Sequence, residues 1–303
     1  MRKRLSILLI ITISPFLWRG AGGEAMAQHN ALFSQYMFNA LLLNPAYAGS
    51  NGVLSATAVH RNQWVGFDGA PQTISFSIHS PLKNKKVNLG ISFINDRLGI
   101  TNRNKINAVY AYRIFLKKSS ISFGLQVGID LVRNNWNKIQ TTTPGDQVFT
   151  GQYSQQTIPE TGFGIYYKHQ KFYLGASAPD LITLKKVSGL IYKPMLFTAG
   201  YLFSFSETFK VKPSVLVKYI RNSPTEIDVN FNAYYKNFGL GVSYRSNDAL
   251  VFLIQYNINM QFSTGYSYDM TTSKLGTFVR GSHEIMLKYE FGYKVNPQSP
   301  RYF

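Results

Sequence analysis

Ile121-Ser-Phe-Gly-Leu-Gln-Val-Gly-Ile-Asp130 is the stretch that decides the fold, because every second residue in it is large and apolar. A period of two is the side-chain period of a β-strand, so the apolar residues share one face. The other face carries serine, glycine, glutamine and aspartate. A strand with one apolar and one polar face is typical of a transmembrane barrel, in which the first faces lipid and the second faces the lumen.

The same alternation recurs along most of the chain, for example in residues 238–245 and 285–291. About 14 segments follow it, which predicts an all-β protein: a transmembrane antiparallel β-barrel of about 14 strands. An even number is expected for a closed bacterial barrel, because both chain ends then lie on one side. The predicted strands span residues 53–61, 71–80, 86–97, 102–117, 119–133, 160–168, 171–178, 192–206, 209–221, 225–236, 237–246, 248–257, 260–269 and 281–293.

The connections between these segments are sorted by length. Every second connection is short, and all the long ones fall at the opposite end of the predicted barrel. Short periplasmic turns and long outer loops are typical of bacterial barrels, so both termini are predicted to be periplasmic. The short connections lie near 81–85, 117–119, 168–171, 206–209, 236–237 and 257–260, and the long ones near 61–70, 134–159, 179–191 and 270–280.

The composition agrees with this prediction. The chain has 20 Tyr, 22 Phe and 3 Trp, only 15% charged residues and no cysteine. After residue 27 it never runs through ~20 apolar residues, so no transmembrane helix is predicted there. The lack of cysteine excludes a disulfide framework and a lipid-modified N-terminus. A soluble β-sandwich or propeller is the alternative fold, but it would not sort its loops by length, and no fixed-period repeat indicates a propeller.

The N-terminus has the pattern of a secretory signal peptide. Residues 2–4 are Arg-Lys-Arg, residues 5–17 are mainly apolar, and Ala25-Met-Ala27 resembles a cleavage site before Gln28. The apolar run is too short to span a bilayer. We therefore predict a signal peptide over residues 1–27 and an outer-membrane location in a Gram-negative bacterium, with a barrel over 51–293 and a periplasmic tail over 294–303.

Residues 28–50 do not alternate as a strand does. Apolar residues recur at helical spacing over residues 32–43, and an Asn-Pro pair ends the pattern. So apolar a stretch would be costly to leave in water, which predicts an N-terminal plug or lid segment in the barrel mouth. A loose periplasmic extension is the alternative. The residues predicted to form the plug are Phe33, Tyr36, Phe38, Asn44, Pro45 and Tyr47.

Several of these motifs resemble a known family. Phe33-Ser-Gln-Tyr-Met-Phe-Asn39 followed by Asn44-Pro-Ala-Tyr-Ala-Gly49 is similar to the opening of the PorP/SprF family of type IX secretion system membrane proteins. The resemblance continues through His60-Arg-Asn-Gln-Trp-Val-Gly-Phe-Asp-Gly-Ala-Pro71 and closes with Gly281-Ser-His-Glu-Ile-Met-Leu287. It spans essentially the whole chain after the predicted signal peptide, and the motifs occur in order.

The resemblance implies a non-enzymatic outer-membrane component of protein export and gliding motility. Some family members are core parts of the secretion machine, with periplasmic partners. Others each serve one large secreted adhesin, supporting its export and its anchoring at the cell surface, and this second role is the function we predict. A passive outer-membrane channel for small or apolar solutes is the alternative from a different class, because a barrel of this size can leave a lumen open.

No catalytic, metal or cofactor site is predicted. The five histidines are scattered, and His79-Ser80 are adjacent, so in a strand they point to opposite faces. Nucleophilic catalysis needs a nucleophile and a base presented together. The acidic residues are dispersed, whereas a calcium loop needs several oxygen ligands close together.

The loop that follows the first predicted strand is the most distinctive one. Its candidate partner-binding residues are Arg61, Trp64, Phe67 and Asp68, because aromatic and arginine side chains are favoured in interfaces. A structural interpretation is equally open: Trp64 would lie in the interfacial aromatic belt, and Arg61 would pair with Asp68.

The formal net charge of +18 also has two interpretations. Basic residues at the outer rim would bind phosphates of lipopolysaccharide by charge-assisted hydrogen bonds. Basic residues in the lumen, such as Arg113, Lys218 and Arg245, would attract an acidic partner. Nucleic acid is not an expected partner, because no recognition module is present.

Overall fold

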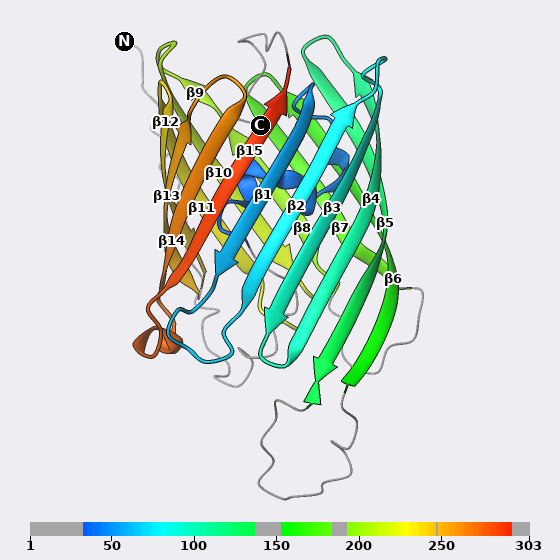
Figure 1. Ribbon diagram of the computed structural model, residues 1–303. Helices are drawn as coiled ribbons and strands as arrows, with labels where there is room; N and C mark the ends of the chain where they lie inside the picture. The colour runs from blue at the N-terminus through cyan, green and yellow to red at the C-terminus, as the bar shows by residue number, and fades with distance from the viewer. Residues whose placement is uncertain (1–32, 137–152, 184–192, 247, 293–303) are drawn as a thin grey trace, which may run out of the picture. The chain divides into compact units, whose positions relative to one another are not determined.

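The computed structural model describes residues 33–136, 153–183, 193–246 and 248–292. The predicted signal peptide (1–27) and tail (294–303) lie outside the described residues. Within the described ranges the strands form one antiparallel sheet that closes on itself as a 14-strand barrel (Figure 1). The pairing of β1 with β15, the first and last strands of the described chain, closes the barrel, and β10 pairs with its neighbour β11. No described helix is both long and apolar enough to cross a membrane.

Most strands pair with their neighbours in sequence. β8 and β9 both pair with β10 and are interrupted at Leu202, so they act as one strand of the barrel. The strands are β1 (Leu54–Asn62), β2 (Gln72–Pro81), β3 (Val87–Leu98), β4 (Thr101–Phe115), β5 (Ser119–Asn135), β6 (Tyr153–His169), β7 (Phe172–Thr183), β8 (Met195–Tyr201), β9 (Phe203–Ser204), β10 (Phe209–Tyr219), β11 (Glu226–Tyr235), β12 (Phe238–Arg245), β13 (Ala249–Asn257), β14 (Phe262–Thr271) and β15 (Ser282–Phe291).

The predicted alternation is confirmed in β5. Leu125 and Val127 point outward and are 56% and 58% exposed, whereas Ser122 and Asp130 point inward and are 1% and 0% exposed. An outer face this apolar would not be stable in water, but it suits the hydrocarbon of a membrane. The predicted fold class, a transmembrane antiparallel barrel, is therefore correct.

The two ends of the barrel differ in their connections. We call the end where β1 begins the turn end, and the opposite end the loop end. Connections at the turn end are all short, as predicted: 82–86, 116–118, 170–171, 205–208, 236–237 and 258–261. The longest connections, 63–71, 136–152, 184–194 and 272–281, all join strands whose described ends lie at the loop end.

The predictions for β6 and β7 were wrong at the loop end. β6 begins at Tyr153 and not near residue 160, and β7 continues to Thr183 and not to 178. β5 and β6 have 17 residues each, whereas a membrane-spanning strand needs only about 9–11. The end of β5 and the beginning of β6 reach past the neighbouring strands (Figure 1). Residues beyond the lipid need no apolar face, so alternation fades there although the ladder continues.

Aromatic side chains gather on the outer face near the turn end. The rings of Phe238 and Tyr256 are 4.7 Å apart, and those of Tyr289 and Phe291 are 4.4 Å apart. Phe205, in the turn after β9, is 70% exposed. Amphipathic and aromatic rings are favoured at the interface between hydrocarbon and headgroups, so these residues mark one border of the membrane-embedded band.

Candidate functional site

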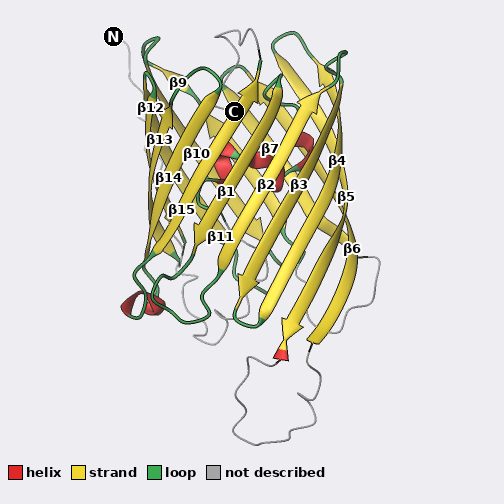
Figure 2. Cartoon of the chain, viewed as in Figure 1, coloured by secondary structure: helices red, strands yellow, loops and turns green. Residues whose placement is uncertain are grey.

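The inner segment, residues 33–51, lies inside the ring of strands (Figure 2). It forms three short 3-10 turns, Tyr36–Phe38, Ala40–Leu42 and Pro45–Tyr47, and not the continuous helix that the apolar spacing indicates. Asn39, between the first two turns, has φ −132° and ψ 55°, which is not helical. The barrel wall supplies many of the contacts of this segment, so its conformation follows the wall and not its intrinsic periodicity.

All six residues predicted to form the plug are buried: Phe33, Tyr36, Phe38, Asn44, Pro45 and Tyr47. The first three pack, with Met37, in one apolar cluster against inward side chains of five strands. Burying each large apolar side chain stabilises the docked segment by about 1.5–3 kcal/mol relative to exposure. The wall residues of the cluster include Val59, Leu196, Leu216, Val251 and Met286.

A buried acidic pair holds the beginning of the inner segment. Both carboxylate oxygens of Glu284 accept backbone N–H bonds, one from Ser34 and one from Gln35, each at 2.8 Å. Asp269 accepts the Ser34 hydroxyl at 2.6 Å. Arg61 balances these charges, with an Nη2 to Asp269 distance of 2.7 Å and an Nη1 to Glu284 distance of 3.2 Å. Charge-assisted bonds of this kind are stronger than neutral ones, so they fix the position of the chain.

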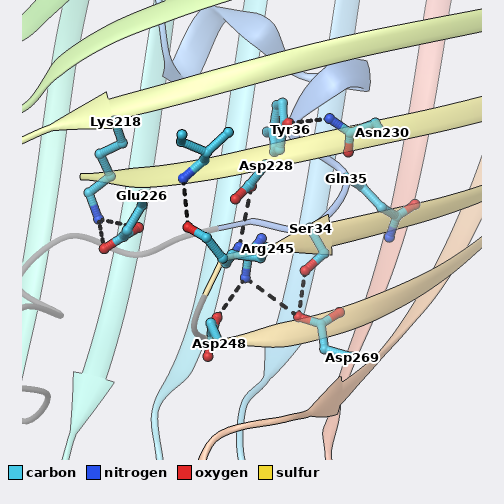
Figure 3. A network of polar contacts seen from close by, with 12 residues as sticks. Ser34, Gln35, Tyr36, Lys218, Glu226, Asp228, Asn230, Arg245, Asp248 and Asp269 are labelled. Atoms are coloured by element: carbon cyan, nitrogen blue, oxygen red, sulfur yellow. Dashed lines mark hydrogen bonds and ion pairs between the residues drawn. The ribbon is translucent and has the colours of Figure 1, made fainter. Parts of the chain in front are cut away.

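A second arginine extends this network along the inner wall (Figure 3). Arg245 lies 3.3 Å from Asp228, 3.1 Å from Asp248 and 3.8 Å from Asp269. Its side chain is buried, and a buried guanidinium is stable only when it is paired and hydrogen-bonded. Nearby, Lys218 lies 3.2 Å from Glu226.

A basic pair holds the other end of the inner segment. Arg113 donates hydrogen bonds to the carbonyl oxygens of Gly49 and Ala48, both at 3.0 Å. Lys168 donates to the carbonyl of Ser50 at 3.0 Å. The segment therefore meets carboxylates at its first N–H groups and cations at its last carbonyl groups. Each end is matched to the sign of the backbone groups it exposes.

These contacts change the interpretation of the inward-facing basic residues. Arg113, Lys218 and Arg245 do lie on the inner wall and are buried, in agreement with the prediction that they face inward. However, Lys218 and Arg245 are paired with carboxylates of this chain, and Arg113 binds backbone carbonyls. Their charges therefore serve the barrel and its inner segment.

The middle of the inner segment lies against glycines of the wall. Asn44 caps the third turn, since its Oδ1 accepts the Ala46 N–H at 2.9 Å, and its Nδ2 donates to the carbonyl of Ile165 on β6 at 3.0 Å. A Cβ at Gly124 on β5 would lie 2.1 Å from the backbone nitrogen of Ala46. A Cβ at Gly164 on β6 would lie 2.0 Å from Asn44 Oδ1. Only glycine permits so close an approach.

Substituting Asn44 by alanine is expected to destabilise the barrel by about 1–3 kcal/mol, since both the cap and the bond to the wall are lost. The measurement is the denaturant midpoint of the purified protein in detergent, followed by the shift in gel mobility on unfolding. Asn84→Ala is the matched control, because Asn84 makes its hydrogen bonds within the exposed β2–β3 turn. Equal midpoints for the two variants would contradict the role given to Asn44.

The structure separates the four predicted partner-binding residues. Arg61 meets neither expectation, because β1 continues to Asn62 and places Arg61 at an inward position, where it pairs with Asp269 and Glu284 and not with Asp68. Phe67 and Asp68 lie in the β1–β2 loop and are exposed, while Trp64 is half-buried.

Trp64, Phe67 and Asp68 line a cleft of about 730 Å³ at the loop end. The loop leans toward the β3–β4 turn, where the Gly99 N–H donates to the carbonyl of Gly69 at 2.9 Å. The sequence did not point to the strand residues that form the other wall of the cleft. They share an outward orientation and polar side chains: Asn62, Gln72, Arg97, Asn102, Arg133 and Asn135.

Several solved structures and one protein family are similar to this chain. Of solved structures, the CymD monoaromatic hydrocarbon channel is 15% identical, with a TM-score of 0.49 over 86% of this chain and 94% of that one. The KdgM porin is 11% identical, with a TM-score of 0.42 over 78% and 99%. Omp33, an outer membrane protein of Acinetobacter baumannii, is 8% identical, with a TM-score of 0.44 over 78% and 96%. These likenesses are too distant to bear on function, and no curated protein matches the sequence.

The family comparison is more specific. The model of the type IX secretion system membrane protein PorP/SprF matches residues 25–289, which include the inner segment and almost all of the barrel. The match agrees with the order of motifs from Phe33 to Leu287. The chain therefore belongs to the PorP/SprF family of type IX secretion system membrane proteins.

Proposed function

We propose that this protein is a non-conducting scaffold in the outer membrane, which holds a secreted, adhesin-like surface protein during and after its export. The family makes it an outer-membrane component of type IX secretion. The observation that carries the finer proposal is the inner segment, anchored at both ends and buried within the barrel. A segment held in this way obstructs the lumen and acts as a plug.

The obstructed lumen distinguishes this proposal from a passive channel. A channel for small solutes needs a continuous aqueous or apolar path, as in the larger porins. In this barrel, the inner segment occupies the inside. Its residues Tyr36 and Met37 belong to an apolar cluster with the wall, and its backbone comes close to Gly124. A scaffold needs a rigid barrel wall and an external binding surface, and it does not require an open path through the lumen.

The proposed orientation places the loop end outside the cell and both termini in the periplasm. Its support is the sorting of the connections, since bacterial barrels carry short turns on the periplasmic side and long loops outside. The proposed docking surface for the secreted protein is therefore the loop end.

Two loops at this end are joined and present exposed rings. Val65 donates its N–H to the carbonyl of Gly281 at 2.9 Å, and Arg280 donates to the carbonyl of Val65 at 2.8 Å. Phe67 on one loop and Phe278 on the other are 49% and 75% exposed. Exposed aromatic residues on mutually supported loops are typical anchors for a protein partner.

Trp64 supports the same loop. It has φ of 50°, a left-handed conformation that costs a non-glycine residue about 1–3 kcal/mol. The backbone N–H of Trp64 donates a hydrogen bond to Ser282 Oγ at 3.1 Å, and this bond holds the strained residue in place. The hydrogen bond and the strained backbone together give the loop a fixed shape at this position.

The test is affinity purification of the tagged full chain from native outer membranes in mild detergent. One very large secreted protein is expected in near-equal amount. The double variant Phe67→Ala, Phe278→Ala should recover at least about 30-fold less of it, because the loss of even one interface anchor weakens binding by about 2 kcal/mol or more. The control Phe203→Ala, Phe205→Ala removes two exposed rings at the turn end and should recover as much as the wild type.

Other outcomes would replace the proposal. Recovery of periplasmic secretion components without a secreted protein would make the chain a core part of the machine. Recovery of no protein at all would contradict the scaffold.

A further inference from the structure

One row of polar residues crosses four adjacent strands on the outer face of the barrel at the loop end. Gln72 lies opposite Arg97, Arg97 opposite Asn102, and Asn102 opposite Arg133. The alternation of strand residues sets their direction. Thr73, next to Gln72, points inward and is buried. Asp130 also points inward and is buried, and Arg133 is an odd number of residues away, so it points outward. This polar row therefore points away from the lumen, toward the membrane side of the rim.

The outer face becomes apolar a short way along the same strands. Four residues further from the loop end, Phe76 lies opposite Phe93, Phe93 opposite Ile106, and Ile106 opposite Ile129. Four residues of strand span about 13 Å. Phe76, Ile106 and Ile129 are 44%, 42% and 41% exposed. The polar row therefore lies at the level where hydrocarbon ends and lipid headgroups begin.

Above the polar row the β1–β2 loop closes a cleft against the wall. The cleft of about 730 Å³ has Arg97 and Arg133 on the strand side and Trp64 and Phe67 on the loop side. Tryptophan is favoured at the headgroup level of a membrane. A space of this size is large enough for a sugar headgroup.

The two arginines are available to an anion. Both are exposed, and among the described residues no ion pair joins either of them to a carboxylate. Arg133 makes one side-chain bond, to Gln155 Oε1 at 3.1 Å. The inward carboxylate of Asp130 is paired with Arg103 instead. Asp68 is the one acidic residue in the described lining of the cleft, and it lies on the loop side.

The remaining lining favours a ligand with many hydroxyl groups. Side-chain amides both donate and accept hydrogen bonds, as sugar hydroxyls do. The Oδ1 atom of Asn62 is buried without a hydrogen-bond partner in the described part of the chain. The amide residues of the lining are Asn62, Gln63, Gln72, Asn102 and Asn135.

We propose that this cleft binds the phosphorylated sugar headgroup of a membrane glycolipid of the lipid A type. The guanidinium groups of Arg97 and Arg133 bind phosphate oxygens by charge-assisted, fork-shaped hydrogen bonds. The amides bind sugar hydroxyls, and the acyl chains extend along the apolar row of Phe76, Ile106 and Ile129. The cleft shares Phe67 with the proposed docking surface for a secreted protein, but its two arginines face the lipid and not the space above the barrel.

The test is native mass spectrometry of the full chain in detergent, titrated with lipid A, dephosphorylated lipid A or phosphatidylglycerol. The wild type should bind lipid A most tightly. The variant Arg97→Gln, Arg133→Gln should bind lipid A at least about tenfold more weakly, since each arginine supplies hydrogen bonds to a charged group. Removing the phosphates from lipid A should weaken binding to the wild type by a similar factor.

A matched control removes two exposed cations elsewhere at the loop end. The variant Lys193→Gln, Arg221→Gln should bind lipid A as the wild type does. Equal lipid A binding by the wild type and the Arg97→Gln, Arg133→Gln variant would overturn the site. Equal binding of phosphatidylglycerol and lipid A would overturn the assignment of a sugar headgroup. The gel mobility of each unheated variant shows that its barrel is folded.

Discussion

A single methyl group added at Gly124 is expected to displace the inner segment from the barrel. The new Cβ would lie 2.1 Å from the nitrogen of Ala46 and 2.3 Å from the carbonyl carbon of Pro45. Both are backbone atoms, so no side chain can rotate away to relieve the overlap. Overpacking typically costs about 1–3 kcal/mol, and a clash with backbone lies at or above the upper end of that range.

The absence of cysteine makes this displacement easy to measure. Ser50→Cys is nearly isosteric and places a thiol at a buried position of the inner segment, where the serine is 7% exposed. A water-soluble maleimide should react slowly with this reporter in the otherwise wild-type chain. It should react much faster when Gly124→Ala is added.

Gly239→Ala is the matched control. Gly239 also lies on a barrel strand, but a Cβ there would lie nearest to the ring of Tyr234, at 3.0 Å, and not to the inner segment. The reporter should stay protected in this variant. Equal labelling of the Gly124→Ala and Gly239→Ala chains would show that Gly124 does not support the inner segment.

Replacing Arg61 by methionine is expected to cost about 3–5 kcal/mol of unfolding free energy, because it leaves the buried carboxylate of Glu284 without its cation and Asp269 with the more distant Arg245. Arg61 is 1% exposed, and it pairs with Asp269 and Glu284, which are 2% and 0% exposed. The hydrophobic stem of methionine fills much of the same space, so the loss reflects charge and not volume. Denaturant unfolding of the barrel in lipid vesicles measures it.

The same pair gives an internal control. Adding Glu284→Gln to Arg61→Met removes one orphaned charge and keeps an oxygen for one of the two N–H groups of Ser34 and Gln35, while the amide nitrogen cannot accept the other. A buried charge without a partner costs more than one lost hydrogen bond. The double variant should therefore be more stable than the Arg61→Met variant. If the losses of unfolding free energy in the two single variants simply add in the double variant, the result would contradict a coupled, buried ion pair, because the effects of substitutions in such a pair are not additive.

The sequence predicted the barrel well wherever the strands lie in lipid. Alternation such as that of Ile121 to Asp130 requires a membrane on one side and a lumen on the other, so pattern and structure agree there. It missed the first part of β6, because Tyr153 to Gln155, opposite Asn135 to Arg133, continue the ladder beyond the region where alternation is needed. It also missed the break at Leu202, which is set by local pairing with Lys171.

The inner segment was predicted only in part. The apolar character of Phe33 to Tyr47 indicated burial, but its anchors lie far along the chain: Glu284 is 250 residues from Ser34. Such pairs cannot be read from one sequence, since only barrel closure brings them together. Gly124 was predicted to face inward, whereas the backbone that approaches it could not be predicted.

Arg61 shows a different limit. Its position next to a distinctive loop suggested a surface role, although Val59 and Arg61 share the inward parity of β1. The alternation of β1 was the signal that could have predicted an inward position for Arg61, and it is a better guide than the distance from the loop. The outward row of Gln72, Arg97, Asn102 and Arg133 likewise needed the register of four strands, which turn lengths set only approximately.

The most direct test of the closed scaffold is the electrical conductance of the purified wild-type chain in a planar lipid bilayer, with insertion confirmed by antibody labelling. The account predicts a silent membrane, because the inner segment is anchored at Glu284 and at Arg113 and is proposed to obstruct the lumen. Steady single-channel conductance from the wild-type protein would contradict it and would make the passive channel the better description.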